Sequence, residues 1–135
     1  MPETTATTTP ADTPESPRRV RVYIAGPYTR GDVAVNVREA MLAWALLQAM
    51  GHAPLCPHWT HFQHLLTPLD YEDWLAFDLE WLPCCDVVLR LPGESAGADR
   101  EVAEARRLGV PVVHDVEDLA ALVSLKVFKE KLVHA

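Results

Sequence analysis

Short apolar strand patterns alternate with longer amphipathic helix patterns from Arg19 onward. The four predicted strands are Arg19–Ala25, His52–Cys56, Asp86–Leu91 and Val110–His114. The predicted helices are Asp32–Met50, Trp59–Leu66, Asp70–Leu82, Asp99–Leu108 and a last one from a cap at Asp115 to about Val133. This alternation predicts an α/β fold, a single parallel sheet with helices on both faces. Ligands in such folds bind beyond the carboxyl ends of the strands. That rule indicates the loop after the first strand, the region after His58, and the loop Pro92–Ala98.

Residues 19–135 are expected to form one domain, preceded by a disordered tail at residues 1–18. The tail contains six threonines and four prolines, and it cannot bury enough apolar surface to offset its ordering entropy. The net charge of −7 argues against nucleic acid as a partner, and no apolar run is long enough for a membrane span. Without a secretory signal pattern, and with three cysteines interpreted as reduced thiols, a cytoplasmic protein is expected.

Asp78 stands in the apolar stripe of its predicted helix. On a helical wheel it falls among Tyr71, Trp74, Leu75, Trp81 and Leu82. A carboxylate on a buried face must be hydrogen-bonded, paired or protonated. It is either a structural carboxylate that caps a neighbouring loop or one that faces a ligand cleft with a perturbed pKa. We favour the cleft.

Glu101 is predicted in the first turn of its helix, where acidic residues are common because they favour the helix dipole. The position alone therefore does not indicate catalysis. However, Glu101 follows the loop Gly93–Ala98 at the carboxyl end of a predicted strand. In that loop Gly97 allows close backbone approach and Ser95 supplies a hydroxyl, and the amides ahead of the helix can hold a phosphate or a sugar hydroxyl.

The first strand and its loop supply three further candidates. Tyr23 alternates with the apolar residues of the strand, so a core tyrosine on the opposite face of the sheet is one interpretation. The loop Ala25–Gly31 matches neither the phosphate-binding nor the dinucleotide-binding glycine pattern. Even so, Gly26 permits close approach of a ligand and Arg30 can meet an anion.

Three histidines, His58, His61 and His64, are separated by three residues each. On a helix this spacing spreads them over about 120°, so all three do not easily meet one ion. The sequence also lacks an HExxH and a CxxC pattern. We therefore expect no metal and no other cofactor, and we interpret His58 as a cleft residue that binds substrate. A metal-dependent protein built on the three histidines is the alternative.

Five short motifs, taken together, resemble the nucleoside 2-deoxyribosyltransferase superfamily, which includes the 2'-deoxynucleoside 5'-phosphate N-hydrolases. The motifs are YIAGP at Tyr23–Pro27, PH at Pro57–His58, DLEWL at Asp78–Leu82, CDVV at Cys85–Val88, and SxGxxxE from Ser95 to Glu101. The resemblance covers about residues 20–115. It implies a flavodoxin-like sheet of four to five strands and an enzyme that cleaves the N-glycosidic bond between base and sugar.

The resemblance also implies a role for each matched residue. Glu101 matches the nucleophile that attacks the anomeric carbon, Asp78 the carboxylate that assists the departing base, and Tyr23 the tyrosine that orients the nucleophile. Gly26 matches the glycine of the loop that lines the pocket. Ser95 stands where the nucleotide hydrolases carry a serine that contacts phosphate, which favours hydrolysis of a nucleotide.

The implied partner is a small-molecule nucleoside or its 5'-monophosphate, and the implied assembly is a homodimer or a higher homo-oligomer. Arg30, His58 and Gly97 are predicted to contribute to substrate binding. Two alternatives stay open. Transfer of the sugar to a second base needs the same two carboxylates as hydrolysis, and a nucleotide-binding module without turnover would need neither.

Overall fold

Parallel strands form the sheet of the computed structural model, which describes residues 19–133 and the side chains of residues 19–125. The strands are β1 (Arg21–Ala25), β2 (Ala53–Leu55), β3 (Val87–Arg90) and β4 (Val112–Val113). The helices are α1 (Val33–Ala49), η2 (Pro57–Trp59), α2 (Thr60–Leu66), α3 (Tyr71–Trp81), η3 (Leu82–Cys84), α4 (Ala96–Leu108) and α5 (Val116–Val133). The predicted tail, residues 1–18, lies outside the described residues. Over the described range, no helix combines the length and the apolar character needed to cross a membrane.

The strand order of the sheet is β2-β1-β3-β4, and each neighbouring pair is parallel. Tyr23 in β1 lies opposite Leu55 in β2 and Val88 in β3, and Leu89 lies opposite Val113 in β4. Flavodoxin-like doubly wound sheets begin with the same order, and the chain reverses direction across the sheet between β1 and β3. The predicted α/β fold with a parallel sheet is confirmed.

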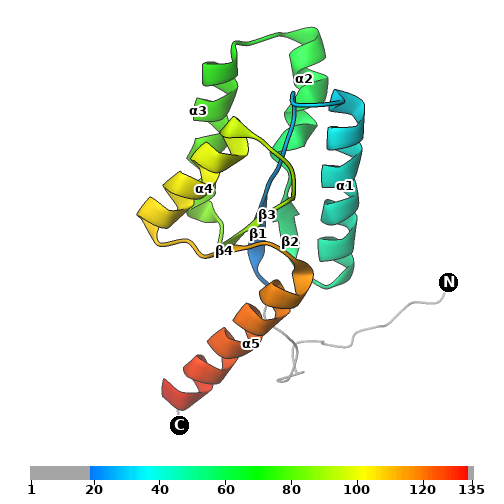
Figure 1. The fold of residues 1–135 in the computed structure, drawn as a ribbon. Coiled ribbons are helices and arrows are strands. Elements are labelled where there is room, and N and C mark those ends of the chain that lie inside the picture. Colours follow the sequence, from blue (N-terminus) through cyan, green and yellow to red (C-terminus); the bar gives the residue numbers. More distant parts are fainter. Residues whose placement is uncertain (1–18, 134–135) are drawn as a thin grey trace, which may run out of the picture.

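Helices cover both faces of this sheet (Figure 1), with α1 on one side and α3 and α4 on the other. The apolar cluster on the α1 side also receives residues of α5; it includes Val22, Ile24, Ala40, Leu47, Leu119 and Val123. Tyr23 lies in the second cluster, together with Leu82 of η3 and Ala105 of α4. The alternation of β1 therefore directs Tyr23 toward the face covered by α3 and α4, opposite to its apolar neighbours in the strand.

Helix α4 begins at Ala96, three residues before the predicted start at Asp99. The reason is a cap, because the Ser95 hydroxyl accepts a hydrogen bond from the amide of Ala98 at 3.0 Å. Glu101 consequently lies in the second turn of α4, and the expectation that it occupies the first turn is wrong. Gly97 lies within the helix, not in the preceding loop.

The apolar stripe predicted for α3 is narrower than the wheel suggested. Leu75 and Leu82 are buried, but Tyr71 and Trp81 are 50% and 48% exposed. Helix α3 contacts η3 and α4. The aromatic rings of Tyr71 and Trp81, at its two ends, lie largely outside these contacts. The expectation that Tyr71 and Trp81 share one buried face with Asp78 is therefore wrong.

Candidate active site

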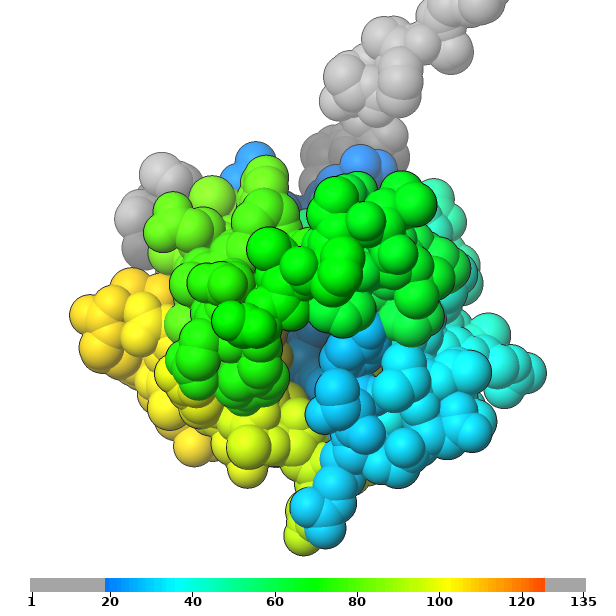
Figure 2. All heavy atoms as spheres, turned by 90° about the horizontal axis from the view of Figure 1, so that it is seen from above, coloured from blue at the N-terminus to red at the C-terminus, as the bar shows by residue number. Residues whose placement is uncertain are grey.

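A cavity of about 870 Å³ opens at the carboxyl ends of β1 and β3, the position at which doubly wound sheets bind ligands. Seen from this end (Figure 2), the surface is hollowed between the segments following β1 and β3 and the green segments of α2 and α3. The three regions indicated by the sequence all line this one cavity: the loop after β1, the region around His58, and the start of α4.

Glu101 lines the cavity, and its carboxyl group contacts Tyr23, which lies outside the lining. Glu101 is 7% exposed, and Tyr23 is fully buried. The Tyr23 hydroxyl donates a hydrogen bond to Oε2 of Glu101. Burial and the nearby charges of Glu101 and Asp78 raise the pKa of Tyr23 far above its usual value, so the phenol keeps its proton and remains a donor.

Two carboxyl groups with raised pKa values line the same cavity. Burial raises the pKa of Asp78 to about 7. Burial also raises the pKa of Glu101 to about 8, and the charge of Asp78 adds to this effect. The hydrogen bond from Tyr23 and the charge of Arg90 act in the opposite direction on Glu101, because both favour its ionised form. Neighbouring carboxyls with such pKa values can exchange protons with a substrate near neutral pH.

Aromatic side chains of α3 form one wall of the cavity. Tyr71 and Trp74 line it, and the Trp74 indole donates a hydrogen bond to Nδ1 of His64 at 2.8 Å. Gly97 lies opposite, where a Cβ atom would come within 3.1 Å of the Tyr71 hydroxyl. Gly97 thus permits α4 to approach α3. Trp81 does not belong to this wall, because it packs edge-on against Phe77 outside the cavity, with a ring separation of 6.3 Å.

The mouth of the cavity is formed by the loops that follow β1 and β3. Arg30 of the first loop pairs with Glu94 of the second at 2.7 Å, with both side chains 73% exposed. Ser95 also lines the mouth. A Cβ atom on Gly26 would lie 3.0 Å from Cβ of Leu91. Gly26 therefore permits the two loops to pack together, in addition to lining the cavity.

The three histidines share no hydrogen-bond partner. Nε2 of His58 donates to the Pro27 carbonyl at 2.8 Å, and burial lowers the pKa of this ring. His61 bonds the Tyr28 hydroxyl through Nδ1 at 2.7 Å. Nδ1 of His64 accepts from Trp74 and also from the Leu69 amide, at 3.3 Å. Among the residues that the structure describes, no group of three or more potential ligands has the arrangement of a metal site.

Sequence reasoning did not single out several residues around the cavity. Tyr28, Leu69 and Glu94 line it. Tyr28 and Glu94 lie in the two loops that follow the carboxyl ends of β1 and β3. The rule that ligands bind at these ends could therefore have indicated both residues. Nothing in the sequence indicated Leu69, which precedes α3.

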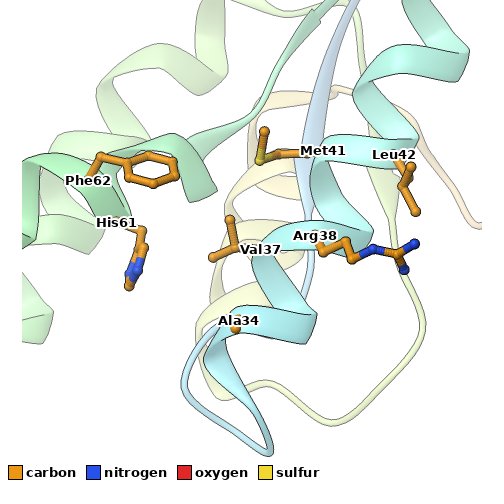
Figure 3. A pocket seen from close by; sticks show the side chains of 7 residues that line it. All are labelled: Ala34, Val37, Arg38, Met41, Leu42, His61 and Phe62. Carbon is orange, nitrogen blue, oxygen red and sulfur yellow. The ribbon is translucent and has the colours of Figure 1, made fainter.

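A second hollow of about 520 Å³ lies between α1 and α2 (Figure 3). Val37, Met41 and Phe62 give it a mainly apolar lining. No carboxyl group lines it. The carboxyl groups of Glu101 and Asp78 therefore lie in the larger cavity, whereas His61 lines the second hollow.

Comparison with known proteins adds a family and a fold. A family model described as a domain of unknown function, DUF7768, matches residues 20–115. The chain belongs to this family. No curated protein matches the sequence significantly. Among solved structures, a 2-deoxyribosyltransferase from the psychrotolerant bacterium Bacillus psychrosaccharolyticus superposes with a TM-score of 0.51 and 22% identity, covering 68% of this chain and 69% of that enzyme.

This DUF7768 domain therefore has the fold of a 2-deoxyribosyltransferase. The resemblance to the nucleoside 2-deoxyribosyltransferase superfamily, inferred from five short motifs, is confirmed at the level of the fold. The family match begins at the residue before β1 and ends after β4. It includes every residue that lines the cavity.

Proposed function

We propose that this DUF7768 protein cleaves the N-glycosidic bond of a nucleoside or nucleoside 5'-monophosphate, by hydrolysis. One observation carries the proposal. The buried carboxyl group of Glu101 and the half-buried one of Asp78 share a cavity, and Glu101 is held by a tyrosine that keeps its proton. A cavity of about 870 Å³ lies within the usual size range of small-molecule sites.

Each carboxyl group has a separate task in this reaction. Bond cleavage develops positive charge on the sugar and negative charge on the base. Glu101 attacks the anomeric carbon and forms a glycosyl-enzyme ester, while Asp78 donates its proton to the departing base. Water, deprotonated by Asp78, then attacks the anomeric carbon and releases Glu101. Tyr23 orients the Glu101 carboxylate through its hydrogen bond.

The protonation states required by this mechanism predict a pH optimum. Glu101 must be ionised and Asp78 protonated when substrate binds. With pKa values of about 8 for Glu101 and about 7 for Asp78, this combination is the minority form, and its population reaches a maximum between the two values. We expect kcat/KM to follow a bell-shaped profile with its maximum between about pH 7 and about pH 8.

Ser95 and Arg30 supply the argument for a phosphorylated substrate. The hydroxyl of Ser95 lies at the N-terminus of α4, where backbone amides favour an anion. Among the described residues that line the cavity, Arg30 is the only lysine or arginine. Because Arg30 forms an ion pair with Glu94, a 5'-phosphate has to compete with the Glu94 carboxylate for the guanidinium. Glu94→Gln is therefore expected to raise kcat/KM for monophosphates relative to the matching nucleosides.

The test is base release from a panel of ribo- and 2'-deoxynucleosides and their 5'-monophosphates, with and without an added acceptor base, followed by chromatography. Glu101→Gln should abolish release and remain folded. Glu104→Gln serves as the matched control, because Glu104 lies on the same helix and pairs with Arg107 away from the cavity. Full activity of Glu101→Gln would refute the mechanism.

The panel also separates the alternatives. Base release without an acceptor supports hydrolysis, and release from monophosphates alone supports the role given to Ser95. Base exchange that requires an acceptor indicates a 2-deoxyribosyltransferase instead. Saturable binding, seen as a thermal shift without base release, indicates a nucleotide-binding module.

A further inference from the structure

Arg90, the last residue of β3, is a nearly buried cation that the proposed reaction does not use. Its side chain is 11% exposed, and the residue pairs in register with Ala25 at the end of β1. A charged group at this depth requires hydrogen-bond partners to offset the loss of hydration. The identity of those partners indicates what Arg90 does.

The guanidinium binds the loop that follows its own strand. Nη1 donates to the carbonyl of Leu91, and Nη2 donates to the carbonyl of Gly93 at 3.0 Å. Nη2 also donates to Oδ1 of Asp99, in the first turn of α4, at 3.1 Å. One planar side chain thus connects the end of β3, the loop, and the start of the helix that carries Glu101.

The opposite side of the same loop packs against the loop after β1. Gly93 has a φ of +113°, and a Cβ atom there would lie 2.8 Å from Cγ of Pro27. The Leu91 side chain likewise packs against Gly26 and leaves too little room for a Cβ atom there. The loop from Leu91 to Glu94 is therefore held between Arg90 and the first loop, and its conformation determines where Ser95 begins α4.

We propose that Arg90 is a positioning residue, whose guanidinium holds the loop from Leu91 to Glu94 so that Ser95 and Glu101 face the cavity. The catalytic consequence rests on the proposed N-glycosidase function, whereas the conformational consequence does not. Lysine at this position keeps the charge but loses the planar fork, and methionine loses both. These two substitutions separate geometry from charge.

The charge has its own measurable effect on Glu101. The groups that face Glu101 are Tyr23 from β1, Asp78 from α3 and Arg90 from β3. Arg90 lowers the pKa of Glu101 against the effects of burial and of Asp78. Arg90→Met should therefore lower the maximum of the kcat/KM profile and move its alkaline limb to higher pH, while Arg90→Lys should leave the alkaline limb where it is.

The experiment measures amide hydrogen exchange and kinetics in Arg90→Lys and Arg90→Met. Arg106→Lys is the matched control, because Arg106 is an exposed arginine of α4 away from the cavity. We expect exchange at residues 91–99 to accelerate by about tenfold or more in both variants, the factor implied by loss of one charged hydrogen bond. Exchange in α1 should stay unchanged. We expect kcat to fall by about a hundredfold through misplacement of the reacting groups.

The outcomes separate this proposal from the proposed function. Unchanged exchange at residues 91–99 in the lysine variant overturns the proposal, as does acceleration spread equally over all elements, which would indicate a merely structural role. If the wild-type protein releases no base, the N-glycosidase function fails, and the exchange data still decide the role of Arg90. If the methionine variant does not fold, hydrogen exchange in the lysine variant still tests whether the planar guanidinium positions the loop.

Discussion

Replacing Glu101 by glutamine should make the protein more stable at alkaline pH than the wild type, by a margin that grows with pH. Burial raises the pKa of Glu101 from its ordinary 4.5 to about 8. A carboxyl group whose pKa is raised by folding stabilises the protein while protonated, and this contribution is lost as the pH rises toward the folded-state value. Glutamine is uncharged throughout and suffers no such loss.

The size of the effect follows from the two pKa values. About 1.4 kcal/mol accompanies each pH unit between them. Between about pH 5 and about pH 8, the free energy of unfolding of the wild type should therefore fall by about 3.5 kcal/mol relative to Glu101→Gln. For a domain of this size, that change corresponds to a relative shift in Tm of about 10 °C.

The assay is denaturant unfolding of wild type and Glu101→Gln at several pH values across this range, with the difference between the two proteins taken at each pH. Glu104→Gln is the control, because Arg107 lowers the pKa of Glu104 and keeps it ionised at every pH used. Its difference from wild type should be nearly flat. A flat difference for Glu101→Gln as well would refute the assignment of a buried, largely protonated Glu101.

Three further substitutions test other contacts. Tyr23→Phe removes the donor that favours ionised Glu101, so kcat/KM at neutral pH should fall by about ten- to a hundredfold, and the alkaline limb of its pH profile should move to higher pH. Ser95→Ala removes the cap of α4 and should lower the free energy of unfolding by about 1 kcal/mol in denaturant titrations. Gly93→Ala introduces a side chain at positive φ and against Pro27, and thermal melts should show a loss of more than about 2 kcal/mol.

Two controls isolate the contacts named in these predictions. Ser124→Ala changes an exposed serine of α5 and should leave stability nearly unchanged, so an equal loss from both serine variants would contradict a capping role. Gly51→Ala also places a side chain at positive φ, with no atom within 4 Å. If Gly93→Ala costs no more than Gly51→Ala, the contact with Pro27 is unimportant.

The sequence predicts each strand and most helix boundaries to within two residues, because the branched apolar residues and the turn residues that delimit them are local signals. The start of α4 is the exception. Gly97 lowers helix propensity, so Ser95–Ala98 resembles a loop in sequence. Close approach to Tyr71 requires a glycine at that position, and this tertiary contact has no trace in the sequence.

The candidate site was predictable where residues lie at the carboxyl ends of strands. Glu101 and Asp78 line one cavity, as the topology rule and the wheel together indicated. Arg90 gave no signal, since a single arginine in a strand resembles a solvent-facing residue and its partners are mostly backbone carbonyls. The prediction that Trp81 is buried was wrong. A helical wheel shows which side chains lie on the same side of a helix, but not how much of that side is covered by neighbouring elements.

The wall of the cavity opposite Ser95 and Glu101 comes from one continuous stretch of chain. Residues 57–74 contribute His58, His64 and Trp74 to the lining, while Tyr23 and Glu101 belong to β1 and α4 outside that stretch. Much of the lining is thus encoded apart from Tyr23 and Glu101, whereas Asp78 lies on the same helix as Trp74, one turn further along the chain. Exchanging residues 57–74 between family members would therefore vary this part of the lining and leave Tyr23, Asp78, Ser95 and Glu101 in place.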